Sequence, residues 1–452
     1  MSVQLFNNGC PEHISSDYRV EITENGTAMN AVCQQAKVRE RLVDEGYMRE
    51  FVRIMSYCLF TADFSSPLTV RVTPSSPFRT CRVRPETAGV TVRSDCVEIR
   101  LEKPARLSVE FDENVHNNLF LFADAAEADR KPAEAENLIC YEPGVYDAGE
   151  IVLTEGQTLY LAGGAYVYGH VTAKGDNITI CGEGVLSGEK LNHDVNKPRR
   201  QLISMTHCKN PVVRDVTLLD SPGWTLCTTW CRNVTIDNIK EICWNENSDG
   251  LDICGTSDVL ITNVFLRNAD DNISVKGRKP SGDSDGDCRN IICRDCVFWC
   301  DKAHNMLIGP EADAERDCVF EHITFDRIYC PYHFEYSETY QGVMAIFCAD
   351  NCAIRDISWS NITVEDIVYG RLISIIYTTV FAKCYGRSVD NIRFSHIDYR
   401  GRRMFLDRIR GLDENHRVTN VTLEDVSVCG VKQTGEDNNF RINGFTDDIR
   451  FC

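Results

Sequence analysis

The segment 244–277 contains three acids whose spacing could support acid–base chemistry. Asp249 lies in the turn-forming sequence NSDG, and Asp270 and Asp271 lie in NADD, with a β-branched run between the two turns. Three carboxylates that meet in space repel one another, which raises the pKa of at least one of them. One protonated acid beside ionised acids is the combination that hydrolysis of a glycosidic bond requires. This chemistry needs a chain that coils back over itself.

The sequence beyond about residue 140 repeats a short unit of two β-branched strands separated by Asn or Asp turns. Examples are RNVTIDNIKE (232–241), SDVLITNVFLRN (257–268) and HRVTNVTLEDVSVCG (416–430). Successive units begin about 23 to 37 residues apart, a period typical of solenoids and propellers. We predict a right-handed parallel β-helix, whose stacked rungs share one core and whose turns favour Asn in left-handed conformations. The alternative is a β-sandwich array without a solenoid.

In such a β-helix, a residue one rung later lies about 4.8 Å above its predecessor. Asp249 and Asp270 are 270 − 249 = 21 residues apart, which is close to one rung. We therefore predict that the two acidic turns lie on adjacent rungs at the same edge, although Asp is also an ordinary turn residue. The longest gaps between units, around 277–289 and 329–350, are expected to form the walls of a cleft.

The first part of the chain has a different pattern of apolar and polar residues. Short alternating segments such as LTVRV, CVEIRLE and NLFLFA predict a small antiparallel β-sandwich. The segment 31–56 has apolar residues at mixed three- and four-residue intervals, which indicates an amphipathic helix or an irregular strap. A polar stretch at 125–137 indicates a boundary, so we predict an all-β protein with a sandwich domain at 1–130 and a β-helix domain at 131–452.

The composition restricts the partners. A net charge of −19 argues against nucleic acid or an anionic membrane surface as the main partner. The first twenty residues lack the basic and apolar regions of a secretion signal, and an odd number of cysteines, 23, favours reduced thiols. We therefore expect a cytoplasmic protein, with a homo-oligomer left open.

Two further clusters could suggest metals. Cys288, Cys293, Cys296 and Cys300 have a spacing that iron–sulfur proteins use, but they occupy positions that hold Thr, Ile or Val in neighbouring repeats. We interpret them as small core residues. The alternating acids of SGDSDGDC (281–288) place Gly wrongly for a calcium loop. We expect no metal and no organic cofactor.

The ordered motifs resemble glycoside hydrolase family 28, the polygalacturonase group, over roughly 140–430. SPGW (221–224), NSDGLD (247–252) and NADD (268–271) are similar to that family's Ser-Pro-x-Trp, Asn-Thr-Asp-Gly-x-Asp and Gly/Gln-Asp-Asp motifs, in the same order. AHNMLIGPE (303–311) partially matches its Gly-His-Gly and Ile-Gly-Ser-Glu motif. The specificity of this resemblance lies in the ordered set.

The resemblance implies roles for individual residues. Asp270 resembles the general acid, whereas Asp249 and Asp271 resemble the pair that positions and deprotonates the attacking water. His304 matches a histidine that supports the protonation state of the acid. Family membership also implies inversion at the anomeric carbon. Lys276 follows the acidic turn as a lysine does in some bacterial members, and could bind a hydroxyl or a carboxylate.

The substrate-binding residues are less well matched. The family's Arg-Ile-Lys motif, which grips a uronate carboxylate, aligns with Gly342–Ile346, where Met344 and Ile346 take the basic positions. Tyr377 lies near the position of a substrate-contacting tyrosine. The aromatic loop 331–340, including Tyr336, is expected to line the cleft, and Asn247 is expected to bind substrate beside Asp249.

The N-terminal domain and the opening of the β-helix also resemble glycoside hydrolase family 49, dextranase-like enzymes that act on neutral α-glucans. We therefore expect an inverting glycoside hydrolase acting on an oligosaccharide, with either a pectin-related galacturonide or a neutral α-glycan as substrate. The alternatives are a dextranase-like endo-α-glucanase, a β-eliminating lyase, which would need an Arg or Lys base and usually Ca²⁺, and a non-catalytic carbohydrate-binding β-helix.

Overall fold

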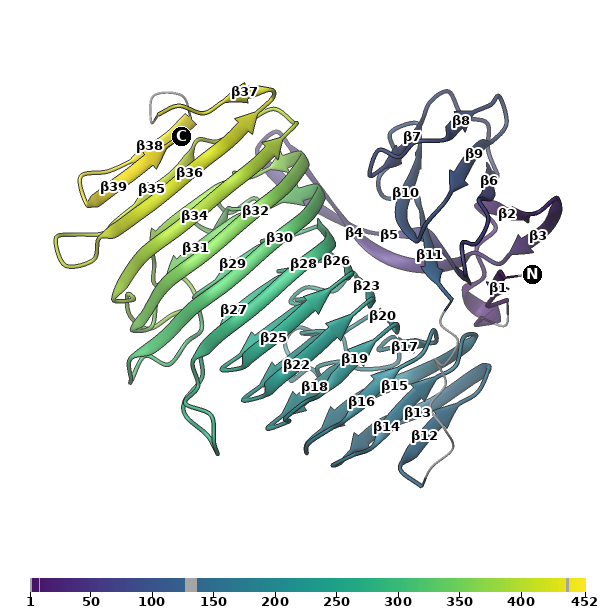
Figure 1. Ribbon diagram of the computed structural model, residues 1–452, viewed down its shortest axis with the longest axis horizontal. Coiled ribbons are helices and arrows are strands. Elements are labelled where there is room, and N and C mark those ends of the chain that lie inside the picture. The colour runs from purple at the N-terminus through teal and green to yellow at the C-terminus, as the bar shows by residue number, and fades with distance from the viewer. Residues whose placement is uncertain (1, 8, 127–135, 436–438) are drawn as a thin grey trace.

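The computed structural model describes residues 2–7, 9–126, 136–435 and 439–452. Two β-sheets form an N-terminal sandwich, which lies beside a long stack of parallel strands (Figure 1). The predicted all-β class and the right-handed parallel β-helix are confirmed. The predicted boundary near 130 falls mostly on 127–135, which lie outside the described residues. No helix among the described residues is long and apolar enough to cross a membrane.

The sandwich packs two sheets around one apolar core. The first sheet contains β1 (Gln4–Leu5), β4 (Gln34–Asp44), β5 (Tyr47–Ala62), β7 (Cys81–Arg84), β10 (Ala105–Phe111) and β11 (Leu119–Ala125). The second contains β2 (Tyr18–Glu24), β3 (Thr27–Ala31), β6 (Leu68–Pro74), β8 (Val90–Val92) and β9 (Val97–Leu101). A short 3₁₀ turn, η1 (Pro11–His13), lies between β1 and β2. All pairs in both sheets are antiparallel except β5 with β11.

The helix predicted over 31–56 is wrong. These residues form most of a long hairpin, in which β4 and β5 pair from Gln34 opposite Tyr57 to Asp44 opposite Tyr47. The two turn residues, Glu45 and Gly46, have φ of 49° and 81°. Two consecutive positive φ angles are typical of a type I′ turn, whose twist matches that of paired strands. This turn, and not the spacing of the apolar residues, decides the local structure.

The β-helix has three faces. The first face contains β12 (Leu138–Tyr141), β14 (Thr158–Leu161), β16 (Thr179–Cys181), β19 (Val212–Arg214), β22 (Arg232–Asp237), β25 (Ser257–Thr262) and β39 (Thr446–Phe451). The face toward the sandwich contains β17 (Val185–Ser187), β20 (Thr217–Leu219), β23 (Lys240–Cys243) and β26 (Phe265–Asn268). Long bent strands continue both faces: β28 (Cys288–Cys300), β30 (Cys318–Phe334), β32 (Cys352–Tyr369), β34 (Ser388–Tyr399) and β36 (Val418–Val428).

The third face carries the candidate site. It contains β18 (Ile203–Thr206), β21 (Leu226–Thr229), β24 (Leu251–Cys254), β27 (Ile273–Lys276), β29 (Met306–Ile308), β31 (Met344–Cys348), β33 (Ile373–Tyr377), β35 (Asp407–Arg410) and β38 (Phe440–Ile442). Two early strands, β13 (Gly144–Leu153) and β15 (Ala165–Ala173), and a short hairpin strand, β37 (Val431–Lys432), complete the domain. The turns from the sandwich-facing strands to this third face carry the acids.

Asparagine has the role that the repeat predicts. Asn177, Asn210 and Asn233 all have φ near 55° and lie on successive rungs. The side-chain amide of Asn210 donates to Asn177 at 2.9 Å, and that of Asn233 donates to Asn210 at 2.7 Å. Because Asn tolerates left-handed backbone and carries both a donor and an acceptor, one residue type satisfies the turn and joins the rungs.

The clustered cysteines are core residues, as predicted. Cys288, Cys293, Cys296 and Cys300 are all at most 2% exposed, and the first three belong to the main apolar core of the β-helix. The nearest two thiols, of Cys293 and Cys296, are 3.8 Å apart and form no disulfide. A second core joins the two domains, where β-helix aromatics such as Trp299 and Phe265 pack against Phe120 of the sandwich.

Candidate active site

A cavity of about 340 Å³ opens where the acidic turns meet the third face. It is lined by three groups of residues: the acids Glu246, Asp249, Asp270, Asp271, Glu311 and Glu335, the cations Lys276 and Lys302, and Trp224, Asn247, Ser337, Tyr340, Val380 and Phe381. All four residues predicted from the acidic segment as catalytic or adjacent, Asn247, Asp249, Asp270 and Asp271, therefore line one cavity. Carboxylate oxygens of the three Asp residues lie within 4.8 Å of one another.

The register of the rungs differs by one residue from the prediction. Leu251 of β24 pairs with Ile273 of β27, so Asp249 stacks on Asp271 and not on Asp270. The backbone confirms this, because the Gly250 amide donates to the Asp271 carbonyl at 2.8 Å. The rung is therefore 22 residues long here. Asp270 lies beside this stack, one position earlier in its turn.

Asp270 has the environment of a general acid. Its carboxylate accepts a hydrogen bond from the backbone amide of Asn247 at 3.2 Å and another from the backbone amide of Asp271 at 3.1 Å. Burial, followed by the charge of Asp271, raises the pKa of Asp270 to about 7, although Lys302 and Lys276 act in the opposite direction. A carboxyl with a pKa of about 7 is about half protonated near neutral pH, so it can donate a proton to a leaving oxygen there.

Asp271 is held by donors from the next rung. His304 donates its backbone amide to Oδ1 at 3.0 Å, and its ring Nδ1 lies 2.7 Å from the same oxygen. Tyr340 lies within 3.4 Å of Oδ2. The fully buried ring of His304 thus contacts Asp271, the neighbour of the predicted acid, because β27 places Asp271 directly below it; its predicted support of the protonation state of Asp270 stays a prediction. These contacts fix the orientation of the Asp271 carboxylate.

Lys276 is the charge that balances this site. Its ammonium lies 3.1 Å from Asp249, 2.9 Å from Asp252 and 2.8 Å from Glu311. It also lies over the Trp224 ring, 3.8 Å from the centroid. Burial alone would lower the pKa of Lys276, but the three carboxylates raise it well above its ordinary value.

For Asp249, burial outweighs the effect of the neighbouring charge. Burial is the largest influence and raises the pKa of Asp249 well above its ordinary value, with Asp252 and the other two acids adding to the rise. The ammonium of Lys276 opposes this shift. The side chain of Lys276 is only 2% exposed, so water does not screen its charge. Its contact with Asp249 therefore favours the ionised form of that carboxyl.

Two predicted substrate-binding tyrosines do not line the cavity. Tyr377 is 8% exposed, belongs to the core of the β-helix and donates its hydroxyl to the Arg417 carbonyl at 2.7 Å. That prediction is wrong, because the alternation along β33 turns this side chain inward. Tyr336 lies between Glu335 and Ser337, which do line the cavity, but its hydroxyl donates to the Gly46 carbonyl at 2.8 Å.

Several lining residues were missed by the sequence reasoning. Glu246 and Lys302 form an ion pair at 2.7 Å across neighbouring turns. Glu335 accepts the Ala303 amide at 3.1 Å, and burial raises its pKa. One sequence signal could have found them. Each of these residues lies one to three positions after a sandwich-facing strand, as Asp270 does after β26.

The rung aligned with Arg-Ile-Lys also needs a correction. Met344 and Ile346 point into the core and are fully buried. The outward positions of β31 are Ala345 and Phe347, which pack with Leu307 of the previous rung. The conclusion that no basic pair occupies this rung is unchanged, but the residues that replace it are an alanine and a phenylalanine.

The three Asp residues have the spacing of a divalent-cation site, and so do Glu321, His322 and Asp356 on the outer face of β30 and β32. In the cavity, the ammonium of Lys276 already supplies a positive charge to Asp249. Acids 283, 285 and 287, considered for calcium, pair instead with cations: Asp283 with Lys209 at 2.8 Å, and Asp285 and Asp287 with Arg289.

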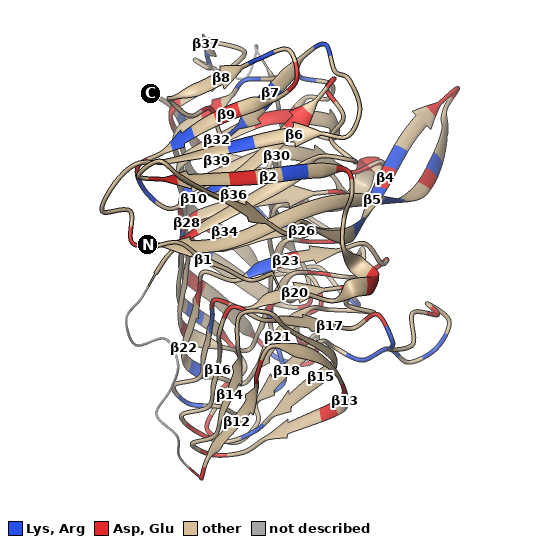
Figure 2. Cartoon of the chain, turned by 90° about the vertical axis from the view of Figure 1, so that its right-hand side faces the viewer, with Lys and Arg blue, Asp and Glu red and all other residues tan. Residues whose placement is uncertain are grey.

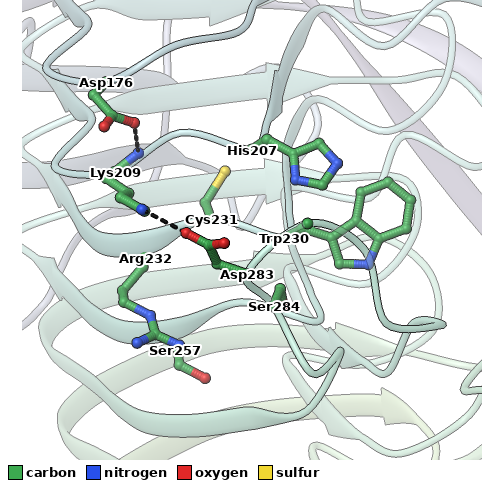
Figure 3. Close-up of a pocket in the computed structure, with 10 residues that line it drawn as sticks. Asp176, His207, Lys209, Trp230, Cys231, Arg232, Ser257, Asp283 and Ser284 are labelled. Carbon is green, nitrogen blue, oxygen red and sulfur yellow. Dashed lines mark hydrogen bonds and ion pairs between the residues drawn. The ribbon is translucent and has the colours of Figure 1, made fainter.

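A second cavity, of about 250 Å³, lies at the other end of the same strands, after β18 and β21 (Figure 3). His207 and Trp230 stack there with ring centroids 4.9 Å apart. Their ring nitrogens bind loop 277–287: His207 lies 3.1 Å from the Ser281 hydroxyl, and Trp230 donates to the Lys279 carbonyl at 2.7 Å. Of the two predicted cleft walls, 329–350 thus contributes to the acidic cavity, whereas loop 277–287 lines this second one.

The fold and the cavity together define a parallel β-helix protein with an acidic cleft. Residues 168–446, more than half of the chain, match Glycosyl hydrolases family 28, and the chain belongs to this family. A probable polygalacturonase of Arabidopsis thaliana is 23% identical over 269 residues, which cover 56% of this chain. The chain spans about half the length of that relative, 54%.

Two solved structures show how far the fold is shared. Dex49A from Penicillium minioluteum aligns over 97% of this chain and 94% of its own, with a TM-score of 0.71 and 14% identity. A polygalacturonase from Erwinia carotovora aligns over 66% of this chain and 86% of its own, with a TM-score of 0.50 and 18% identity. The first alignment includes the sandwich domain, as the resemblance to family 49 predicted. At these identities the likeness establishes the fold alone.

Proposed function

We propose that this protein hydrolyses O-glycosidic bonds in an oligosaccharide, with Asp270 as general acid. The observation that carries this proposal is the meeting of three carboxylates in one cavity. Burial and the charge of Asp271 raise the pKa of Asp270 to about 7, and Asp270 lies within 4.8 Å of two further carboxylates that have cationic or hydrogen-bonding partners. A non-catalytic sugar-binding protein has no need for a protonated acid beside partnered ones.

The reaction would proceed by direct attack of water. Asp270 donates its proton to the leaving glycosidic oxygen, while Asp249 and Asp271 hold the attacking water and accept its proton. The ammonium of Lys276 opposes the rise that burial causes in the pKa of Asp249, and His304 fixes the orientation of the Asp271 carboxylate. Membership of family 28 supports inversion at the anomeric carbon, which is the outcome that we propose.

The stereochemical outcome is a separate point to test. Carboxyl groups about 5 Å apart are typical of retaining glycosidases, whereas inverting enzymes usually separate them by roughly 6.5–9.5 Å. Here one oxygen of each Asp lies within 4.8 Å of the others, which describes the closest approach of the three side chains. NMR of the first-formed product anomer decides between the two: inversion agrees with the proposal, and retention would assign one of the paired Asp residues as a nucleophile.

We further propose a neutral sugar as the substrate unit in the cavity. The lining has six acids and two lysines, and both lysines are already within 3.1 Å of acids. The next rungs present Leu307, Ala345 and Phe347 outward, so no basic pair is available there for a uronate carboxylate. A negatively charged sugar would be repelled by this field. Imported fragments in the cytoplasm are the substrate source that we propose.

The test is hydrolysis of matched panels of α-glucan and galacturonide oligosaccharides by the wild-type protein and by Asp270→Asn. We expect the wild type to cleave neutral oligosaccharides and the variant to retain the fold, measured by circular dichroism, but lose turnover. Preference for galacturonides would overturn the neutral assignment, and full activity of Asp270→Asn would overturn the assignment of the acid. Sugar binding without turnover by the wild type would identify a binding protein.

A further inference from the structure

The β4–β5 hairpin leaves the sandwich and extends along the β-helix. Figure 2 shows it projecting from the body of the molecule, with basic and acidic residues along both strands. Its first half is buried, where Ala36 and Val38 pack on outward side chains of β20, β23 and β26. Its second half reaches the corner at which those strands turn into the third face. This is the corner that carries the catalytic acids.

Three hydrogen bonds join the hairpin to this corner. Arg39 Nε donates to the Trp244 carbonyl at 3.1 Å, and Arg41 Nη1 donates to the Asp301 carbonyl at 2.6 Å. In the third hydrogen bond, the hydroxyl of Tyr336 donates to the carbonyl of Gly46 in the hairpin turn at 2.8 Å. The three β-helix residues belong to three different rungs. One strand pair from the N-terminal domain therefore binds three of the four turns between β23 and β31, and the turn that it does not bind is 269–272, which carries Asp270 and Asp271.

Each of these turns also lines the catalytic cavity. Trp244 is two residues before Glu246, Asp301 immediately precedes Lys302, and Tyr336 lies between Glu335 and Ser337. The hairpin thus binds the outer side of the turns whose inner side faces the acids. A shift in any one of the three contacts would move a lining residue.

Arg41 is the residue of the hairpin best placed to act on the acids. Its side chain is 1% exposed and pairs with Glu50 on β5 at 2.6 Å. Its charge lowers the pKa of Asp270, in the same direction as Lys302 and Lys276. The charged and titratable groups around Asp270 are Asp249, Asp271, Lys276, Lys302, Tyr340, Cys300 and Arg41.

We propose that the β4–β5 hairpin supports, from outside, the turns that line the catalytic cavity, and that Arg41 is a positioning residue for hydrolysis, acting on Lys302 through the Asp301 backbone and on Asp270 through its charge. This inference rests on the proposed function. It gives the N-terminal domain a role in the reaction, since Arg41 belongs to that domain and the catalytic acids belong to the β-helix.

The experiment measures the pH dependence of kcat/KM for two variants with opposite expected signs. Arg41→Met removes a positive charge, so the pKa of Asp270 rises and the basic limb of the profile moves to higher pH. Glu50→Gln leaves the charge of Arg41 less compensated, so the basic limb moves to lower pH. Arg53→Met is the matched control, because Arg53 pairs with Glu40 at 2.6 Å on the exposed side of the hairpin; its profile should equal that of the wild type.

Hydrogen exchange of the same proteins separates this inference from the proposed function. Arg41→Met should speed amide exchange at 244–249 and 301–305, and Arg53→Met should not. If the wild type hydrolyses no glycoside, the proposed function fails, and exchange alone decides whether the hairpin supports the lining turns. If Arg41→Met does not fold, Glu50→Gln still tests the sign. A basic limb that is unmoved in both variants would overturn the role of Arg41, and unchanged exchange in a folded Arg41→Met would overturn the support of the turns by the hairpin.

Discussion

The two cavities on the third face share a Trp and a Lys–Asp pair but differ in their acids and in their solvent exposure. They lie at opposite ends of β21 and β24, and six acids line the first whereas two, Asp176 and Asp283, line the second. In the first cavity, the side chains of Lys276 and Asp249 are 2% and 4% exposed, whereas the Lys209 and Asp283 side chains of the second are 51% and 82% exposed. Water screens the second pair, so its interaction is weak. The two cavities thus contrast a buried cluster of carboxylates with an exposed ion pair of the same residue types.

The largest contrast should come from removing one acid in each cavity. Asp270→Asn removes the proton donor, and we expect turnover to fall by about 10²–10⁴-fold. Asp283→Asn in the second cavity should leave turnover unchanged, because Asp283 pairs only with a solvated lysine. Steady-state kinetics on one cleaved oligosaccharide measures both. Equal losses in the two variants would remove the distinction between the cavities.

Replacing the ion-paired lysine of each cavity should change the unfolding free energy of the protein by different amounts. Lys276→Met leaves Asp249, Asp252 and Glu311 without their shared cation, and removing one partner of a buried ion pair typically costs about 3–5 kcal/mol of unfolding free energy. Lys209→Met removes an exposed pair and should not measurably change stability. Urea unfolding followed by fluorescence gives both values. A Lys276→Met protein as stable as the wild type would show that the buried acids find other partners.

The pH dependence of stability should also separate the cavities. The pKa of Asp270 is raised in the folded protein from its ordinary 3.8 to about 7, so its contribution to stability is complete below about 3.8 and is lost as pH rises through about 7. The slope for one such group is at most about 1.4 kcal/mol per pH unit. Asp270→Asn should reduce this slope, and Asp283→Asn should not. Urea unfolding at several pH values between 4 and 8 checks both variants.

The smallest contrast concerns the two tryptophans. Trp224→Ala removes a ring that lies over the Lys276 ammonium, a contact worth about 0.5–2 kcal/mol, so KM or kcat should change by about tenfold. Trp230→Ala removes the anchor of loop 277–287 and should change neither constant by more than about twofold. Proteolysis of the loop should accelerate in Trp230→Ala alone. A larger kinetic effect of Trp230→Ala would connect the second cavity to substrate binding.

Much of the fold could be predicted because the signals were local and repeated. Asn at left-handed turns and β-branched residues between them recur often enough to define rungs without any distant contact. The hairpin of 34–62 was missed, because its apolar residues have no strict alternation and its turn, Glu45–Gly46, is one short signal. Tyr377 was misplaced for a related reason: one residue of error along a strand exchanges the core for the surface.

The sequence by itself determined the acids, their order and their approximate rung spacing, because these depend on residue type and on a period that the chain repeats. Only the tertiary structure decided that Asp249 stacks on Asp271, that His304 contacts Asp271, and that Lys276 joins three carboxylates. It also decided that Arg41 of the N-terminal domain donates to the carbonyl of Asp301, 260 residues away in the chain. These facts depend on register, burial and the docking of one domain on another, and no local pattern in the chain encodes them.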